Sequence, residues 1–171
     1  ILRLSADIGH YIADAHVPLH TTRNYNGQLT NQKGIHGFWE SRVPELKGDN
    51  YNYFVGKAKY IDKPLDKIWG IIKESYNAKD SVLLFEARLN SRYELDKKYS
   101  FEERGKKLVK VYSKEYSEEY EKMLNGMIER RMRESVINVA SFWYTAWVNA
   151  GQPELTISDK NFFAADTSDT V

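Results

Sequence analysis

The sequence predicts an all-α fold from three observations. Apolar residues recur at every third or fourth position over most of the chain, which is the period of an amphipathic helix. The four prolines fall at expected starts or ends of helices, where a missing amide proton is tolerated best. A chain of 171 residues that is 42% hydrophobic and 29% charged is typical of one soluble domain with its own core. We therefore expect one helical domain over residues 1–155 and a polar tail over residues 156–171.

The first part of the chain is divided by its prolines. Apolar residues at helical spacing predict a helix over residues 2–17, and Pro18 ends it because proline cannot donate a backbone hydrogen bond. Residues 21–34 are rich in Asn, Gln, Thr and Gly, a composition that predicts a loop. A short helix is expected over residues 35–43, ended by Pro44.

The middle of the chain is less clearly patterned. For residues 51–60, a short helix and irregular aromatic packing both stay open. Pro64 fits the first turn of a helix, and the apolar residues after it support either one helix or two that are broken near Asn77. Ser100 and Glu103 form a capping-box pattern, which predicts another helix that bends at the next glycine.

The last expected helical stretch runs to about Val148 and is ended by Gly151 and Pro153. Its early part, which contains the basic run ERRMR, carries charges of both signs and is expected to face solvent. Its final part, VINVASFWYTAW, is apolar almost all round, so we expect a buried helix with both tryptophans in the core. Three tyrosines at helical spacing are expected to serve core packing rather than base stacking: Tyr112, Tyr116 and Tyr120.

Composition excludes several kinds of function. The chain has no cysteine, so it has no disulfide, thiolate metal site or cysteine nucleophile. Its formal net charge of +1 gives no overall attraction to nucleic acid or to an anionic membrane. Its apolar runs are too short to cross a bilayer, so no transmembrane segment is expected. Nothing in the sequence calls for an obligate protein partner.

All four histidines lie in one segment, HYIADAHVPLHTTRNYNGQLTNQKGIHGFWES. His10 and Asp14 are four residues apart on one expected helix, and His36 and Glu40 repeat this spacing on the next. Side chains at that spacing share a helix face, with Cβ atoms about 6 Å apart. His20 follows the proline break between the two pairs. A single pair of this kind is usually a surface hydrogen bond, but two pairs with a third histidine indicate a metal site of imidazole and carboxylate ligands.

The segment HYIADAHVPLH, followed by GIHGFWES, resembles the zinc-dependent phospholipase C and single-strand-specific nuclease superfamily. That family has the pattern H-x3-D-x5-H, then a loop, then H-x3-D or H-x3-E, and five positions of this chain fit it. The resemblance implies an all-helical domain of the zinc-dependent phospholipase C type, with up to three zinc ions in one cleft. It assigns five metal ligands: His10, Asp14, His20, His36 and Glu40.

The resemblance also gives each ligand a role. His20, His36 and Glu40 are expected to hold one zinc ion by themselves. His10 is expected to bind a second zinc ion, and Asp14 to bridge the second ion to a third. His16 has no place in the pattern, so we expect it to make a structural or ligand-orienting hydrogen bond.

The family's other ligands lie upstream of the His10 helix, and this chain begins at Ile1 without a methionine. The chain therefore resembles an N-terminally truncated member with one complete zinc site. We expect the 171 residues alone to show little hydrolysis, even with added zinc. No signal peptide is visible, whereas the family resemblance implies a secreted or periplasmic protein.

The expected function is a zinc-dependent phosphodiester hydrolase, phospholipase-C-like, in which an activated water attacks phosphorus. No catalytic side chain is assigned, because this chemistry needs no protein nucleophile. Glu40 favours a phospholipase, whereas Trp39 and the stretch DAHVPLH favour a nuclease or 3′-nucleotidase. A third alternative is a helical structural or binding domain with a degenerate metal site. The substrate is a phospholipid head group or a nucleotide, and its binding residues stay open.

Overall fold

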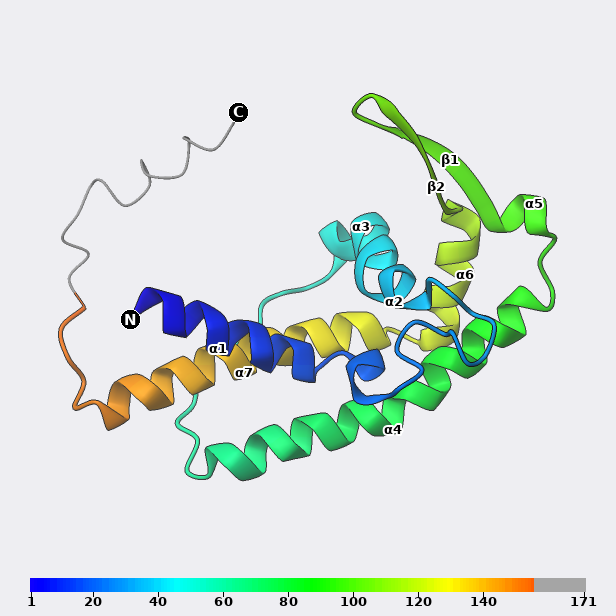
Figure 1. Cartoon of the computed structure of the whole chain (residues 1–171). Helices are drawn as coiled ribbons and strands as arrows, with labels where there is room; N and C mark the ends of the chain where they lie inside the picture. Colours follow the sequence, from blue (N-terminus) through cyan, green and yellow to red (C-terminus); the bar gives the residue numbers. More distant parts are fainter. Residues whose placement is uncertain (156–171) are drawn as a thin grey trace.

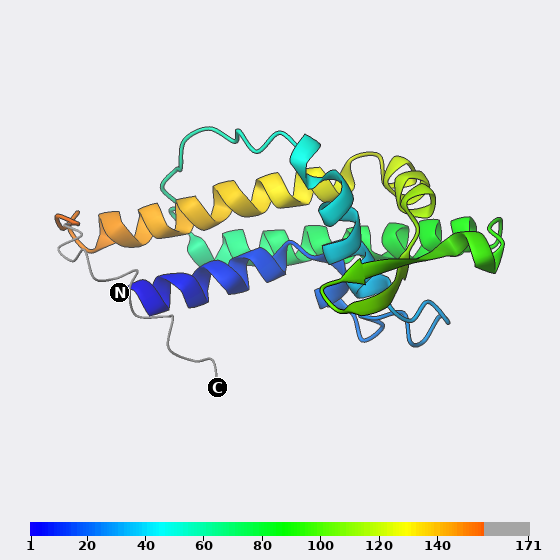
Figure 2. The ribbon, with the colours of Figure 1, turned by 90° about the horizontal axis from the view of Figure 1, so that it is seen from above.

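The structure is a computed structural model that describes residues 1–155, so the expected tail lies outside the described residues. Three long helices form its main body: α1 (Leu2–Ala15), α4 (Pro64–Asn90) and α7 (Met127–Asn149). They lie side by side, with α1 antiparallel to α7 and in contact with both others (Figures 1 and 2). The mostly helical fold confirms the expected class in outline, and one β-hairpin departs from it.

Helix α1 ends at Ala15, two residues before the predicted end, because Pro18 follows and begins a short 3-10 helix, η1 (Pro18–Thr21). Leu19 in η1 is fully buried against the core, and η1 packs on α4. The chain then forms the expected loop up to Gly34. Both ends of the loop therefore lie next to the body of the molecule.

The second predicted helix is longer than expected. Short helix α2 (Ile35–Gly37) continues into a wide π-type turn, η2 (Phe38–Arg42), and then into α3 (Val43–Lys47). The prediction that Pro44 ends the helix is wrong, because Pro44 occupies the first turn of α3, where no amide donor is needed. A 3-10 turn, η3 (Gly48–Asn50), follows, and the chain from 52 to 61 has no regular structure.

Helix α4 is continuous, so the expected alternative of a break near Asn77 is wrong. The helix predicted from Ser100 is also wrong. After the short helix α5 (Leu95–Lys98), the chain forms a hairpin of β1 (Tyr99–Arg104) and β2 (Lys107–Tyr112). Its two strands pair antiparallel, and they are joined through Gly105, whose φ of +62° suits a tight hairpin turn.

The last predicted helix is in fact two helices. Helix α6 (Lys114–Leu124) begins at Ser113, whose side chain accepts a hydrogen bond from the Tyr116 amide. The chain then reverses at Asn125 and Gly126, which both have left-handed backbone angles, before α7 begins. Asparagine and glycine are the residues that adopt this conformation most readily.

The core is aromatic and lies between α4, α6 and the segment 35–47. Tyr116 and Tyr120 are fully buried, and the Phe38 ring stacks on the rings of Tyr112 at 3.9 Å and Tyr120 at 4.8 Å. The prediction that these tyrosines serve packing is confirmed. The apolar core comprises Val17, Leu19, Ile35, Phe38, Trp39, Val43, Val82, Leu89, Tyr116, Tyr120, Leu124 and Ile128.

The final part of α7 is not the buried apolar helix that its composition predicts. Trp143 is 46% exposed and Trp147 is only half-buried, whereas Ser141 and Thr145 are buried. The irregular segment 52–61 runs alongside α7 there, and its backbone amides need acceptors. The amides of Lys59 and Ile61 donate to Ser141 Oγ at 3.1 Å and Thr145 Oγ1 at 2.9 Å.

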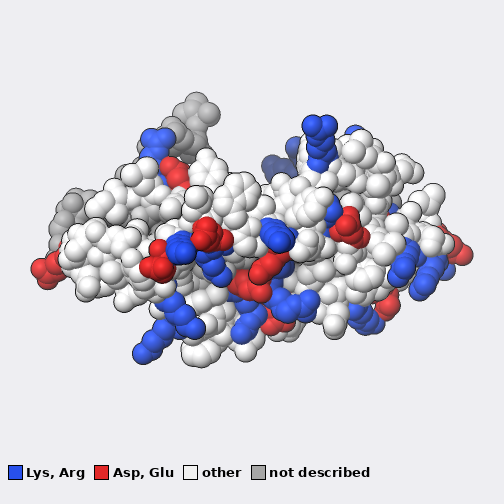
Figure 3. All heavy atoms as spheres, turned by 90° about the horizontal axis from the view of Figure 1, so that it is seen from below, with Lys and Arg blue, Asp and Glu red and all other residues white. Residues whose placement is uncertain are grey.

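The basic run at the start of α7 is not uniformly solvated as predicted. Arg131 is 7% exposed, and its guanidinium donates to backbone carbonyls of His16 and Ile71 and to Ser75 Oγ. These bonds tie α7 to the end of α1 and to α4. In the view from below, charged side chains of both signs stand next to each other on the surface (Figure 3).

Candidate metal centre

Three of the five predicted ligands meet in one place. His36 Nε2 lies 2.7 Å from Glu40 Oε2 and 3.3 Å from His20 Nε2, and His20 Nε2 lies 3.7 Å from the same carboxylate oxygen. One ligand atom from each residue therefore lies within 4.8 Å of the other two. Two imidazole nitrogens and one carboxylate oxygen form a donor set that zinc binds with an open fourth position.

Backbone carbonyls fix which ring nitrogens face the centre. His20 Nδ1 lies 3.2 Å from the Asp14 carbonyl oxygen, and His36 Nδ1 lies 3.2 Å from the Tyr25 carbonyl oxygen. A carbonyl only accepts, so these contacts place a proton on each Nδ1, and each Nε2 faces the centre, where its lone pair is free to bind a cation when Nε2 carries no proton. Two lone pairs and a carboxylate oxygen then face one another, and a cation between them satisfies all three.

The helix that carries His36 and Glu40 is anchored by its opposite side. Ile35, Phe38 and Trp39 are each at most 3% exposed, so the intervening turns hold His36 and Glu40 outward on one face. Gly34, with a φ of +98°, turns the loop into this helix. His20 reaches the same point from η1, on the far side of the loop.

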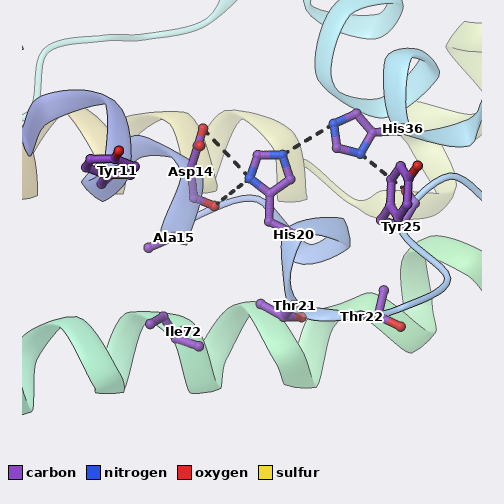
Figure 4. A pocket seen from close by; sticks show the side chains of 9 residues that line it. All are labelled: Tyr11, Asp14, Ala15, His20, Thr21, Thr22, Tyr25, His36 and Ile72. Carbon is purple, nitrogen blue, oxygen red and sulfur yellow. Dashed lines mark hydrogen bonds and ion pairs between the residues drawn. The ribbon is translucent and has the colours of Figure 1, made fainter. Parts of the chain in front are cut away.

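The site opens into a cleft of about 700 Å³ lined by nine residues. Figure 4 shows His20 between Asp14 and His36, with the Tyr25 side chain beside His36. The side chains of His20, His36 and Glu40 are 29%, 26% and 37% exposed, which leaves room for water or a substrate at a bound ion. The cleft is lined by Tyr11, Asp14, Ala15, His20, Thr21, Thr22, Tyr25, His36 and Ile72.

The other two predicted ligands form a looser pair beside the cleft. His10 Nε2 lies 3.3 Å from Asp14 Oδ2, and the His10 side chain is 71% exposed. Asp14 Oδ1 lies 3.7 Å from His20 Nδ1, the ring nitrogen that points away from His36 and Glu40. Asp14 therefore lies next to the trio without contributing a ligand atom to it. Within residues 1–155, the only group of three close ligands is the trio of His20, His36 and Glu40.

His16 is structural, as expected. Its Nδ1 donates to the Ile12 carbonyl at 2.7 Å, and its Nε2 accepts from the Asn138 amide at 3.0 Å. Burial lowers the pKa of His16 to about 4, so the ring is neutral at pH 7. Both ring nitrogens are occupied, which leaves no lone pair for a metal.

Two features of the site could not be read from side-chain chemistry. The acceptors that orient His20 and His36 are backbone carbonyls, which every residue carries. The loop between the histidines is also fixed by Gln32, which hydrogen-bonds to Glu86 on α4. The concentration of Asn, Gln and Gly in the loop was the available signal, because such residues bond to backbone and adopt tight turns.

The resemblance to a known family rests on the motif alone. No family model, curated protein or solved structure matches the chain. Among residues 1–155, no helix combines the length and the apolar character needed to cross a bilayer.

Proposed function

We propose that His20, His36 and Glu40 bind one zinc ion and that the protein is a zinc-dependent phosphodiester hydrolase of the phospholipase C type. The observation that carries the proposal is the convergence of two Nε2 atoms and one carboxylate oxygen, with both Nδ1 atoms held by carbonyls. A ring held in this way cannot turn its other nitrogen to the ion, so the site is preorganised for binding.

The chain's own groups define what this cleft offers a phosphodiester. Zinc bound there lowers the pKa of a coordinated water towards about 7 and offsets negative charge that grows at phosphorus. His20, His36 and Glu40 would hold the ion, and two of them, His20 and His36, line the cleft. Asp14 is the one carboxylate among the nine residues that line the cleft, and its backbone carbonyl orients the His20 ring.

His10 and Asp14 extend the proposal to further ions. The motif assigns them to a second and a third zinc ion, and they lie beside the same cleft as the trio. As a pair they offer two donors where a zinc ion takes about four, so they need additional ligands to hold an ion tightly. We therefore expect one tight zinc site per chain.

Zinc stoichiometry is the deciding experiment. The protein is stripped with a chelator, titrated with zinc, and analysed for metal content and for the shift in melting temperature. We expect one tightly bound zinc ion per chain and a higher melting temperature, because binding to the folded state alone stabilises it. Absence of binding would contradict the proposal. Preference for Fe²⁺ would also contradict it, because two histidines and one carboxylate form the site of many iron oxygenases.

A substrate panel then separates the remaining alternatives. The protein with its natural N-terminus is assayed on phosphatidylcholine, single-stranded DNA and nucleoside 3′-phosphates, with and without chelator. Phosphatidylcholine cleavage that chelation abolishes is the expected result. Cleavage of DNA or nucleotides instead favours the nuclease alternative. A protein that binds zinc, folds and cleaves none of them is a structural or binding domain.

A further inference from the structure

We propose that Gln32, held by the buried carboxylate of Glu86, is a positioning residue that sets the zinc affinity of the trio. The proposal rests on the proposed zinc site and adds what controls it. The loop from Thr22 to Gly34 supplies the Tyr25 carbonyl that orients His36, and Gln32 lies in the loop between these two residues. Any movement of Gln32 therefore changes the relation between the ring and its acceptor.

The backbone of Gln32 closes the loop in both directions. Its amide donates to the Gly27 carbonyl at 2.8 Å, and its carbonyl accepts from the Ile35 amide at 3.0 Å. Gly34 adds a second closure, since its amide donates to the Asn26 side-chain oxygen at 3.0 Å. Ile35, the residue before His36, is thus hydrogen-bonded directly to Gln32.

The side chain of Gln32 fixes this closed loop to the body of the molecule. Its Nε2 donates to the Leu83 carbonyl at 2.7 Å and to Glu86 Oε2 at 2.6 Å, both on α4. Gln32 is 7% exposed, so water does not replace these bonds cheaply. The position of the loop over α4 consequently depends on one amide group.

Glu86 is a rigid acceptor for that amide. It is fully buried, and its Oε1 accepts from Lys98 Nζ at 2.9 Å and from the Tyr116 hydroxyl at 2.8 Å. The ammonium group of Lys98 balances the carboxylate charge. Its Oε2 faces Gln32, so three elements other than α4 meet at one carboxylate: the loop, α5 and α6.

The contacts run without a gap from Glu86 to the ion site. Glu86 holds Gln32, Gln32 holds the turn at Gly27 and the start of α2, and the loop carbonyl of Tyr25 holds His36 Nδ1. Hydrogen bonds that orient a metal ligand change metal affinity by about 10–100-fold when they are removed. Gln32 acts one contact further out, so we expect the lower end of that range.

The test is Gln32→Met, which keeps the length of the side chain and removes the amide. Zinc affinity is measured by competition with a chromophoric chelator, at a temperature where every variant is fully folded. We expect a Kd roughly tenfold weaker than that of the wild type. The matched control is Tyr120→Phe, which removes a buried 2.9 Å hydrogen bond to the Val82 carbonyl of the same helix. The control should lower the melting temperature and leave the Kd unchanged.

Gly27→Ala is the second variant, and it decides the matter if Gln32→Met does not fold. A methyl group at Gly27, whose φ is +71°, would overlap the carbonyl group and the Cβ of Gln32, so it would displace Gln32 and open the loop without removing the Gln32 amide group. It should weaken zinc binding to a similar extent. A wild-type Kd in the variant that folds overturns the inference, and so does an equal loss in Tyr120→Phe. If the wild type itself binds no zinc, the proposed function fails first, which is a distinct result.

Discussion

The two histidine–carboxylate pairs share one sequence spacing and differ in almost everything else. His36 and Glu40 approach to 2.7 Å, and the His36 ring is 26% exposed. His10 and Asp14 approach to 3.3 Å, and the His10 ring is 71% exposed. A helix face brings the members of each pair together, but only His36 has a loop carbonyl behind its ring and a second histidine in front of it.

The surroundings of the two pairs explain the difference. Behind His36 lies the stacked aromatic core, which holds α2 and η2 in place. Behind α1 lie polar contacts, chiefly Arg131 and His16, and the outer face of α1 carries exposed apolar side chains. Spacing therefore supplies a pair of potential ligands, and packing against a second element makes the pair a site. The exposed large apolar residues are Ile1, which precedes α1, and Leu2, Leu4, Ile8 and Tyr11 within it.

The largest effect should come from removing the polar link behind α1. Arg131→Ala leaves the His16 and Ile71 carbonyls and Ser75 without their buried donor, and we expect a loss of about 4 kcal/mol in the free energy of unfolding. Urea denaturation measures it. Arg130→Ala is the matched control on the same helix, where the exposed guanidinium bonds only to Asn125, and it should cost under about 1 kcal/mol. Equal losses in the two variants would show that α1 is held by its apolar residues instead.

The next effect separates the two pairs directly. His36→Ala removes one of three ligands from the trio, so we expect zinc affinity to fall by about a hundredfold or more. His10→Ala leaves the trio intact and should change the affinity for the first zinc ion less than about threefold. Isothermal titration of both variants with zinc gives the comparison. A large loss in His10→Ala would mean that both pairs hold the same ion.

The smallest effect concerns Glu121, a half-buried residue near the aromatic core with one buried carboxylate oxygen that has no hydrogen-bond partner. Burial raises the pKa of Glu121, whose Oε1 accepts from the Tyr51 hydroxyl at 3.1 Å while Oε2 has no partner. Because its folded pKa lies above the unfolded value, the folded state loses stability as pH rises through that pKa. Glu121→Gln keeps the Tyr51 contact without the charge, so it should add about 1 kcal/mol at pH 7.

The pH dependence provides the check on Glu121. Urea denaturation at pH 7 and pH 4 should show the advantage of Glu121→Gln at the higher pH and a smaller one at the lower pH, where the wild-type carboxyl takes up its proton. A difference between the variants that is the same at both pH values would show that packing, and not charge, sets it.

The family motif predicted the trio, and the local geometry explains why its three residues meet. Two ligands lie on one helix face, and Pro18 ends α1 where His20 must turn towards them. What the sequence could not predict was the orientation of the rings, because the Asp14 and Tyr25 carbonyls carry no side-chain signal. The second and third zinc sites that the motif implies stay predictions.

The hairpin and the end of α7 show where local patterns fail. Ser100 and Glu103 match a capping box, yet each instead pairs across the hairpin, with Val111 and Leu108 respectively. The residues that pair with a strand lie outside the local pattern. A short stretch can therefore match a helix-capping pattern and still form a strand in the folded protein. In α7 the apolar residues indicated burial, whereas the buried side chains include Ser141 and Thr145, because a neighbouring segment requires acceptors there.

The path of segment 52–61 along α7 has a consequence for the exchange of amide protons with solvent. An irregular segment normally exchanges its amide protons quickly, because local fluctuations expose them. The amides of Lys59 and Ile61 are bonded to hydroxyls that themselves donate to α7 carbonyls, Ser141 to Ile137 and Thr145 to Ser141, each at 2.7 Å. Ser141 and Thr145 are four helical residues apart, a rise of about 6 Å, and Lys59 and Ile61 are two extended residues apart, a rise of about 6.6 Å. The two spacings match, so both hydrogen bonds form together. We therefore expect these two protons to exchange with solvent more slowly than the amide proton of Tyr60, which lies between them.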